Sequence, residues 1–197
     1  MLADLESAKN DVSVSLVSRP RAMTNGHKVP DSPPRDRLRI RVARSDEAPA
    51  IVELTVAIFR GRTHTRCARF ANAAEVEQLM KRGKFLLAEN EKQIVGCAYL
   101  EPRLEATRLE LLAVTPSQQR AGVGSQLLDA AERLSSSMEC LFMHLRVVNL
   151  HWETLRFYRR RGYLEFGIES LSRDQPLSRN CHVVRMCKRL NAEGVAF

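Results

Sequence analysis

The stretch Leu109-Glu-Leu-Leu-Ala-Val-Thr-Pro-Ser-Gln-Gln-Arg-Ala-Gly-Val-Gly-Ser-Gln-Leu-Leu128 decides how this chain folds. It opens with an apolar run that predicts a strand over 109–114, and Pro116 ends that strand. A glycine-bearing turn follows. Apolar residues at helical spacing then predict a helix that begins near Val123. A strand, a tight turn and a helix therefore follow one another within a single short segment.

The turn in this segment suits an anionic ligand. Glycines at positions 122 and 124 let the backbone approach a ligand closely and turn consecutive N–H groups toward one point. The same N–H groups are the unsatisfied donors at the start of the helix, where the helix dipole favours negative charge. The segment therefore has the features of a pyrophosphate-binding turn.

Two common phosphate-binding loops fit these residues poorly. The nucleotidase loop G-x-x-x-x-G-K-[ST] needs a lysine after its last glycine, and Ser125 follows Gly124 here. A dinucleotide-binding fold needs a third glycine, where the chain has Leu127, and an acidic residue after the next strand, where it has Val147 and Val148. Both interpretations are therefore disfavoured.

Residue periodicity on either side of this segment predicts one α/β domain with a mixed sheet. Period-2 alternation and apolar runs predict strands, and capping residues with 3.6-residue spacing predict helices. Strands are expected near 38–43, 85–89, 94–100, 109–114, 141–148, 163–169 and 182–188, and helices near 46–59, 73–81, 123–134 and 151–161. The order is β-α-α-β-β-β-α-β-α-β-β, without an internal repeat.

Two motifs link the chain to a known family. Gln119-Arg-Ala-Gly-Val-Gly124 matches [QR]-x-x-G-x-[GA], and Phe157-Tyr-Arg-Arg-Arg-Gly-Tyr163 matches F-Y-x-x-x-G-[FY]. Both resemble motifs of the GNAT superfamily of acetyl-CoA-dependent N-acetyltransferases, and Val184–Leu190 is similar to that family's last strand. The resemblance covers about residues 38–190, and the expected element order is the family's order. It implies the GNAT fold, a twisted mixed sheet of about six to seven strands flanked by about four helices.

The resemblance also implies where acetyl-CoA, the acyl donor, would bind. Backbone groups of Leu112, Ala113 and Val114 would pair with the pantetheine arm like an added strand. The turn would surround the pyrophosphate, and a helix tyrosine would meet the cofactor sulfur. The residues expected at the cofactor, besides those three, are Gln119, Arg120, Ala121, Gly122, Val123, Gly124, Ser125 and Tyr158. The structural alternative is a tight turn that binds no ligand.

Acetyl transfer to an amine needs a base and an acid, because an alkyl amine has a pKa of ~10 and a departing thiolate must gain a proton. Glu110 is the candidate base, and strict strand alternation places it on one face with Leu112 and Val114. A solvated or salt-bridged Glu110 is the alternative. Tyr158 is the candidate acid by resemblance. Its alternative is core packing, although Phe157 is expected to be the core residue of the pair.

The acceptor is less constrained than the donor. A basic loop with Arg60, Arg62, His64 and Arg66 lies where relatives shape the acceptor pocket. If it faces inward, a neutral, aromatic or acid-bearing amine is favoured over a polyamine; a solvent-facing loop is the alternative. The sequence predicts acetylation of a small-molecule primary amine by direct attack in a ternary complex. A protein N-terminal or lysine acetyltransferase and a non-catalytic acyl-CoA sensor remain alternatives.

Composition narrows the choice of partners. Lysine and arginine number 31 against 23 aspartates and glutamates, and the resulting net charge of +8 favours an anionic partner. Zinc-finger spacings and basic heptads are missing from the sequence, so nucleic acid is not expected. Five cysteines without C-x-x-C spacing predict neither a disulfide framework nor a metal site. The sequence leaves a homodimer open.

The ends of the chain read differently from its middle. Residues 1–37 lack a regular period and predict a flexible tail; a transit peptide is the alternative, although Asp4, Glu6 and Asp11 are atypical of one. Residues 191–197 are expected to form a C-terminal tail beyond a domain at 38–190. Without a long apolar run or a signal peptide, we expect a soluble cytoplasmic protein with no membrane contact.

Overall fold

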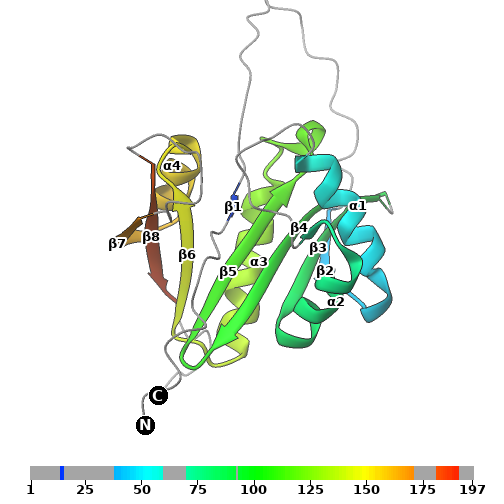
Figure 1. Cartoon of the computed structure of the whole chain (residues 1–197), viewed down its shortest axis with the longest axis horizontal. Helices are drawn as coiled ribbons and strands as arrows, with labels where there is room; N and C mark the ends of the chain where they lie inside the picture. The colour runs from blue at the N-terminus through cyan, green and yellow to red at the C-terminus, as the bar shows by residue number, and fades with distance from the viewer. Residues whose placement is uncertain (1–13, 16–37, 60–69, 92, 171–180, 191–197) are drawn as a thin grey trace, which may run out of the picture.

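The computed structural model describes residues 14–15, 38–59, 70–91, 93–170 and 181–190, and Figure 1 shows how their elements are arranged. The strands are β1 (Val14–Ser15), β2 (Arg39–Val42), β3 (Lys84–Asn90), β4 (Gln93–Arg103), β5 (Ala106–Val114), β6 (Phe142–Val148), β7 (Leu164–Ser170) and β8 (His182–Arg189). The α-helices are α1 (Ala48–Phe59), α2 (Ala73–Arg82), α3 (Val123–Ser137) and α4 (Trp152–Arg160). Two 3-10 turns, η1 (Ser45–Glu47) and η3 (Pro116–Gln118), precede α1 and α3.

These elements form one mixed sheet with the strand order β2-β3-β4-β5-β6-β8-β7. Its neighbours run antiparallel except for β5 and β6, which are parallel. The predicted order of strands and helices from residue 38 onward is confirmed. One strand was not predicted: β1 comes from the expected N-terminal tail and pairs in parallel with β5. The rest of that tail lies outside the described residues.

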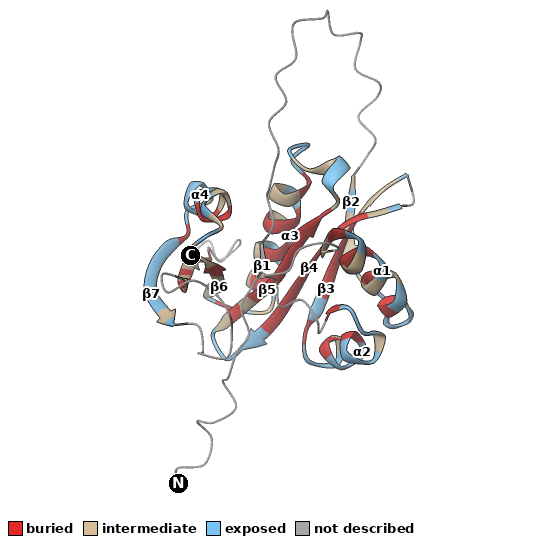
Figure 2. Cartoon of the chain, turned by 45° about the horizontal axis from the view of Figure 1, so that its top comes forward, coloured by how far each residue is buried: buried red, intermediate tan, exposed pale blue. Residues whose placement is uncertain are grey.

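The helices cover the sheet unevenly. Helices α1 and α2 bury one face of β3, β4 and β5, and the core there includes Ile51, Leu79, Tyr99 and Leu111. Helix α3 packs on the opposite face, where residues of α4, β6 and β8 join a second core. Figure 2 shows buried residues along the central strands and an exposed β7 at the edge. The glycine-bearing turn joins these layers at the surface, because it connects β5 of the sheet with α3.

Local signals explain where the elements begin and end. The side chain of Asn72 accepts hydrogen bonds from the N–H groups of Ala74 and Glu75, at 2.9 and 3.4 Å, and so starts α2. Gly83 ends the helix by donating its N–H to the Leu79 carbonyl at 2.9 Å. A Cβ on Gly83 would lie 2.2 Å from the carbonyl oxygen of Leu100, so only glycine fits this crossing of α2 and β4.

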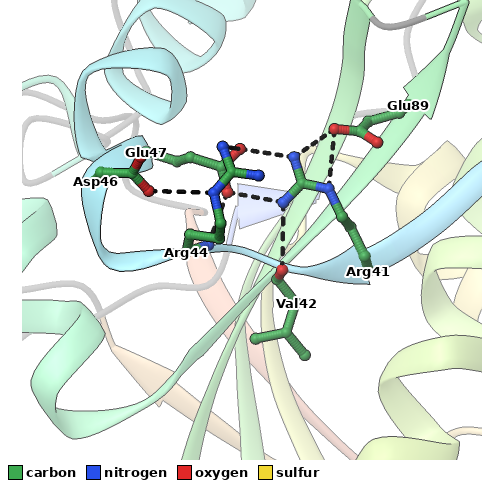
Figure 3. A network of polar contacts seen from close by, with 6 residues as sticks. All are labelled: Arg41, Val42, Arg44, Asp46, Glu47 and Glu89. Carbon is green, nitrogen blue, oxygen red and sulfur yellow. Dashed lines mark hydrogen bonds and ion pairs between the residues drawn. The ribbon is translucent and has the colours of Figure 1, made fainter.

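A cluster of charged side chains fastens the edge strand β2 to the body of the domain (Figure 3). The Arg41 guanidinium donates to both Glu47 carboxylate oxygens, at 2.6 and 2.7 Å, and its Nε donates to Glu89 at 2.9 Å. The backbone N–H of Arg44 also donates to Glu47, at 2.7 Å. Hydrogen bonds from Arg41 lower the pKa of Glu47 from 4.5 to about 2. The cluster thus joins β2, η1 and β3.

Replacing Glu47 with glutamine should destabilise the chain at neutral pH by about 1–3 kcal/mol, because Arg41 loses a buried charged partner. The folded-state pKa of Glu47 lies below its usual value, so its contribution is complete above about pH 4.5 and disappears as the pH falls through about 2. Denaturant unfolding of E47Q and the parent between pH 7 and pH 3 measures the difference, which should shrink with acidification. Asp46→Asn is the control, since Asp46 is 72% exposed in its pair with Arg44. An equal effect in both variants would contradict the assignment.

Candidate functional site

Strands β5 and β6 separate halfway along β5, and this separation creates the candidate site. Within the described residues, the two strands pair only from Ala106 opposite Phe142 to Leu109 opposite Leu145. Beyond that point β6 stays paired with β8, whereas β5 continues on to Val114 alongside β4. From residue 110 onward, one edge of the β5 backbone therefore faces the gap between the two strands and is not paired with β6.

The β5 edge leads directly into the glycine turn. Arg120 and Gly122 both adopt the left-handed region, with φ of 66° and 87°. Gly122 is the residue that precedes α3, and no described side chain caps this helix end. The first N–H groups of α3 thus point out of the helix without a side-chain acceptor, as in an anion-binding helix terminus. The sequence predicted a glycine-bearing turn without these angles, and the left-handed conformation of Arg120 was not expected.

The space in front of the turn is open. A Cβ built on Gly122 would meet no described atom within 4 Å, and one on Gly124 would meet only the Val114 side chain, at 3.8 Å. Packing within the described fold therefore does not demand glycine at position 124. A ligand that approaches the backbone closely here would require glycine at position 124. The open space before the turn therefore fits a pyrophosphate.

The side chain of Gln119 is hydrogen-bonded to the end of β5. Its side-chain amide donates to the carbonyl oxygen of Val114 at 3.1 Å. This bond links the turn to the end of β5 and fixes the angle at which the strand enters the loop. Gln119 thus holds the turn against the end of β5.

The candidate base, Glu110, sits at an irregularity of β5. Leu100 pairs with Leu109 and Tyr99 pairs with Leu111, so Glu110 is the extra residue at a shift in the register between β5 and β4. Such a bulge bends a strand and re-aims the side chain at that position. The bend coincides with the point where β5 leaves β6.

This bulge corrects one sequence prediction. Strict alternation placed Glu110 on one face with Leu112 and Val114, but the extra residue breaks the alternation. Leu109, not Glu110, joins Leu112 and Val114 in the core beside α3. Leu111 belongs to the core beside α1 and α2.

The environment of Glu110 is buried and charged. Its side chain is fully buried, and its carboxylate lies 3.1 Å from Nε of Arg108, whose side chain is 34% exposed. The pair therefore links the buried carboxylate at the bulge to a partly exposed arginine. The ion pair with Arg108 agrees with the salt-bridged alternative for Glu110. A buried carboxylate beside the separated strands is also suited to proton transfer.

The candidate acid, Tyr158, lies in the core formed by α3, α4 and the sheet. Its side chain is 1% exposed, and its ring packs against Phe157 and Tyr163 at centroid distances of 5.2 and 5.3 Å. Phe157 is only partly buried, so the expected division between the two residues is wrong: Tyr158 is the core residue. Leu112 and Val114 of β5 belong to the same core as Tyr158.

Sequence reasoning missed a cationic surface beside the gap. Arg108 pairs with His144 across β5 and β6, and Arg146 pairs with Arg185 across β6 and β8. Burial, together with the nearby charges of Arg185 and Arg108, lowers the pKa of His144. These side chains therefore face one another on one side of the sheet. The strand order β6-β8-β7 brings them together, and no local pattern in the sequence signals it.

Three other expectations concern the basic loop, metal binding and membrane contact. The basic loop with Arg60, Arg62, His64 and Arg66 lies outside them. Within the described ranges, no three His, Cys, Asp or Glu side chains gather as a metal site would require. The helices of the described ranges are all too short or too polar to cross a bilayer.

Comparison with known proteins agrees with this geometry. Residues 81–165 match the model of the acetyltransferase (GNAT) domain. An amino-acid acetyltransferase of Pseudomonas putida is 30% identical over 136 residues, which are 67% of this chain and 29% of the relative. The corresponding protein of Pseudomonas aeruginosa is 28% identical over 137 residues. The chain thus spans less than a third of the length of these curated relatives.

Solved structures share the fold. The ribosomal-protein-S18-alanine N-acetyltransferase from Escherichia coli superposes with a TM-score of 0.66 and 16% identity, over 82% of this chain and 99% of that one. A GNAT family acetyltransferase from Elizabethkingia anophelis with acetyl-CoA bound gives a TM-score of 0.63 and 19% identity, over 79% and 100%. The chain thus shares the fold of these structures and contains a GNAT acetyltransferase domain, matched over residues 81–165.

A glutamate at position 124 should abolish acetyl-CoA binding without unfolding the chain, because the open space before the turn would then hold a negative side chain. We expect the dissociation constant to rise by about 100-fold or more, measured by calorimetric titration. Ser137→Glu is the matched control, since it adds the same charge at the other, exposed end of α3. Unchanged affinity in a folded G124E variant would remove the cofactor from this turn.

Proposed function

We propose that this chain transfers the acetyl group of acetyl-CoA to the amine of a small molecule that carries a carboxylate, an α-amino acid being the leading class. The observation that carries the donor assignment is the β5 edge that leaves β6 and runs into a glycine turn with open space before it. The match to the GNAT domain supports the reaction class. The acceptor class rests on the charges beside the gap.

The cofactor would bind along β5 and at the start of α3. Backbone groups of Leu112, Ala113 and Val114 would pair with the pantetheine amides, as the family resemblance implies. The N–H groups of the turn and of the first residues of α3 would meet the pyrophosphate. Bound in this way, acetyl-CoA supplies an activated acetyl thioester at the point where the two strands separate.

In the reaction, the amine nitrogen attacks the thioester carbonyl carbon, so that a C–N bond forms and the C–S bond breaks. One proton must leave the amine nitrogen, and Glu110 at the bulge is the group we assign to accept it, directly or through water. The departing sulfur must gain a proton, and the Tyr158 hydroxyl is the group we assign to supply it. The core around Tyr158 buries its side chain and would hold the ring in place.

The acceptor would approach from the side of the sheet that α1 and α2 leave uncovered. Arg108 and Arg185 are 34% and 43% exposed on this side, close to the point where the strands separate. Glu169 neutralises part of this charge, because it pairs with Arg185 at 3.2 Å and with Arg146. The remaining positive potential favours an anionic acceptor and disfavours a polyamine.

The names of the relatives favour the same class. The curated relatives that match most of this chain are amino-acid acetyltransferases. The structural neighbours named for ribosomal-protein alanine support the alternative of a protein N-terminus as acceptor. A non-catalytic sensor would bind acetyl-CoA and release no thiol with any amine.

Tyr158→Phe should lower kcat by about 100-fold and leave the affinity for acetyl-CoA within about threefold, since only a proton donor is removed. Thiol release under saturating substrates measures it. Tyr163→Phe is the matched control. Tyr163 is equally buried, but its hydroxyl donates to Glu132 at 3.0 Å, so its loss should reduce stability and spare kcat. Equal kcat values in Y158F and the parent would remove Tyr158 from the mechanism.

An α-amino acid should be acetylated with a kcat/KM at least about tenfold above that of its α-amide, because the amide lacks the anionic carboxylate. Arg185→Gln should reduce this preference by raising KM for the amino acid alone. Arg189→Gln serves as the control, because Arg189 lies on the same strand but pairs with Phe142 at the end away from the gap. Activity on peptides and none on free amino acids would instead establish the protein-acceptor alternative.

A further inference from the structure

The N-terminal strand β1 occupies the gap that β6 leaves. Val14 pairs with Leu111 and Ser15 pairs with Leu112, both in parallel. Pairing between β5 and β6, also parallel, ends two residues earlier, at Leu109. Figure 1 shows β1 beside β5 in the gap between β5 and β6. Strand β1 therefore becomes the parallel neighbour of β5 beyond the point where β6 stops pairing with it.

This docking position coincides with the edge assigned to the pantetheine arm. Leu112 is common to the β1 pairing and to the cofactor residues Leu112–Val114. Backbone N–H and C=O groups on one edge of a strand point toward a single neighbour. The β4 side of β5 is already filled, because Leu111 and Leu112 pair there with Tyr99 and Ala98. The chain's own segment and the proposed cofactor position thus meet on the same edge of β5, at Leu112.

We propose that the Val14–Ser15 segment competes with acetyl-CoA for the edge of β5. The segment docks on β5 by strand addition, and it must leave before the pantetheine arm can bind. This inference rests on the proposed function, since it needs acetyl-CoA to use the β5 edge. The interaction surface is the edge of β5 at Leu111 and Leu112. Its occupant is the N-terminal segment of the same chain.

The covalent connection makes this competition effective. Only 22 residues, 16–37, separate Ser15 from Leu38, so the pairing is intramolecular and does not weaken with dilution of the protein. Two paired residues are a short contact, so the cofactor can displace them. The apparent affinity for acetyl-CoA is the intrinsic affinity reduced by the fraction of molecules whose β5 edge is open. A segment docked in nine molecules of ten would weaken binding tenfold.

The test compares two double variants of the full chain. Val14→Pro with Ser15→Pro removes both N–H groups from β1 and prevents regular pairing. Val14→Ala with Ser15→Ala keeps both N–H groups and is the matched control. Calorimetric titration gives the dissociation constant for acetyl-CoA, at two protein concentrations. Hydrogen exchange of the amides of Leu111–Ala113, without acetyl-CoA, reports the docking itself.

We expect the proline pair to bind acetyl-CoA about three- to tenfold more tightly than the parent and to exchange its β5 amides faster, while the alanine pair matches the parent. Equal affinities for the parent and the proline pair overturn the inference and leave the proposed function intact. A difference that grows with protein concentration overturns it as well, since the segment would then come from a second copy. Loss of acetyl-CoA binding in all three proteins refutes the proposed function, and the competition with it.

Discussion

The separation of β5 from β6 after Leu109 is the constraint on which the rest of the site depends. A continuous sheet would satisfy the backbone of β5 on both sides and leave no place for an extended ligand. The bulge at Glu110 bends β5 at the same place, and the Gln119 side chain fixes the end of the strand to the turn. Strand, bulge and turn thus form one continuous edge, to which we assign the cofactor.

The two cores keep this edge in place. Leu111 packs under α1 and α2, whereas Leu112 and Val114 pack under α3 beside Tyr158. Residues from both layers clamp β5, so it can leave β6 without losing its position. The cationic side chains gather where α1 and α2 end their cover of the sheet. In the proposed function, backbone groups of β5 and the turn would bind the donor, and these side chains would select the acceptor.

Sequence alone predicted the order of elements and the glycine turn, because both depend on local patterns such as the run from Leu109 to Leu128. It could not predict the bulge at Glu110, which arises from the register between β4 and β5. The burial of Tyr158 rather than Phe157 depends on how α4 is rotated against the sheet. Likewise, Arg108 and Arg185 both lie near His144 only because β8 inserts between β6 and β7. Domain limits, a cytoplasmic location and a homodimer stay predictions.

The most direct measurement of the central claim is hydrogen exchange of the whole chain with and without saturating acetyl-CoA, read peptide by peptide. Our account predicts that bound acetyl-CoA slows exchange in two segments, Glu110–Val114 on β5 and Arg120–Ser125 at the turn, because their N–H groups would meet the pantetheine and the pyrophosphate. Tight binding with unchanged exchange in both segments would contradict it and place the cofactor elsewhere.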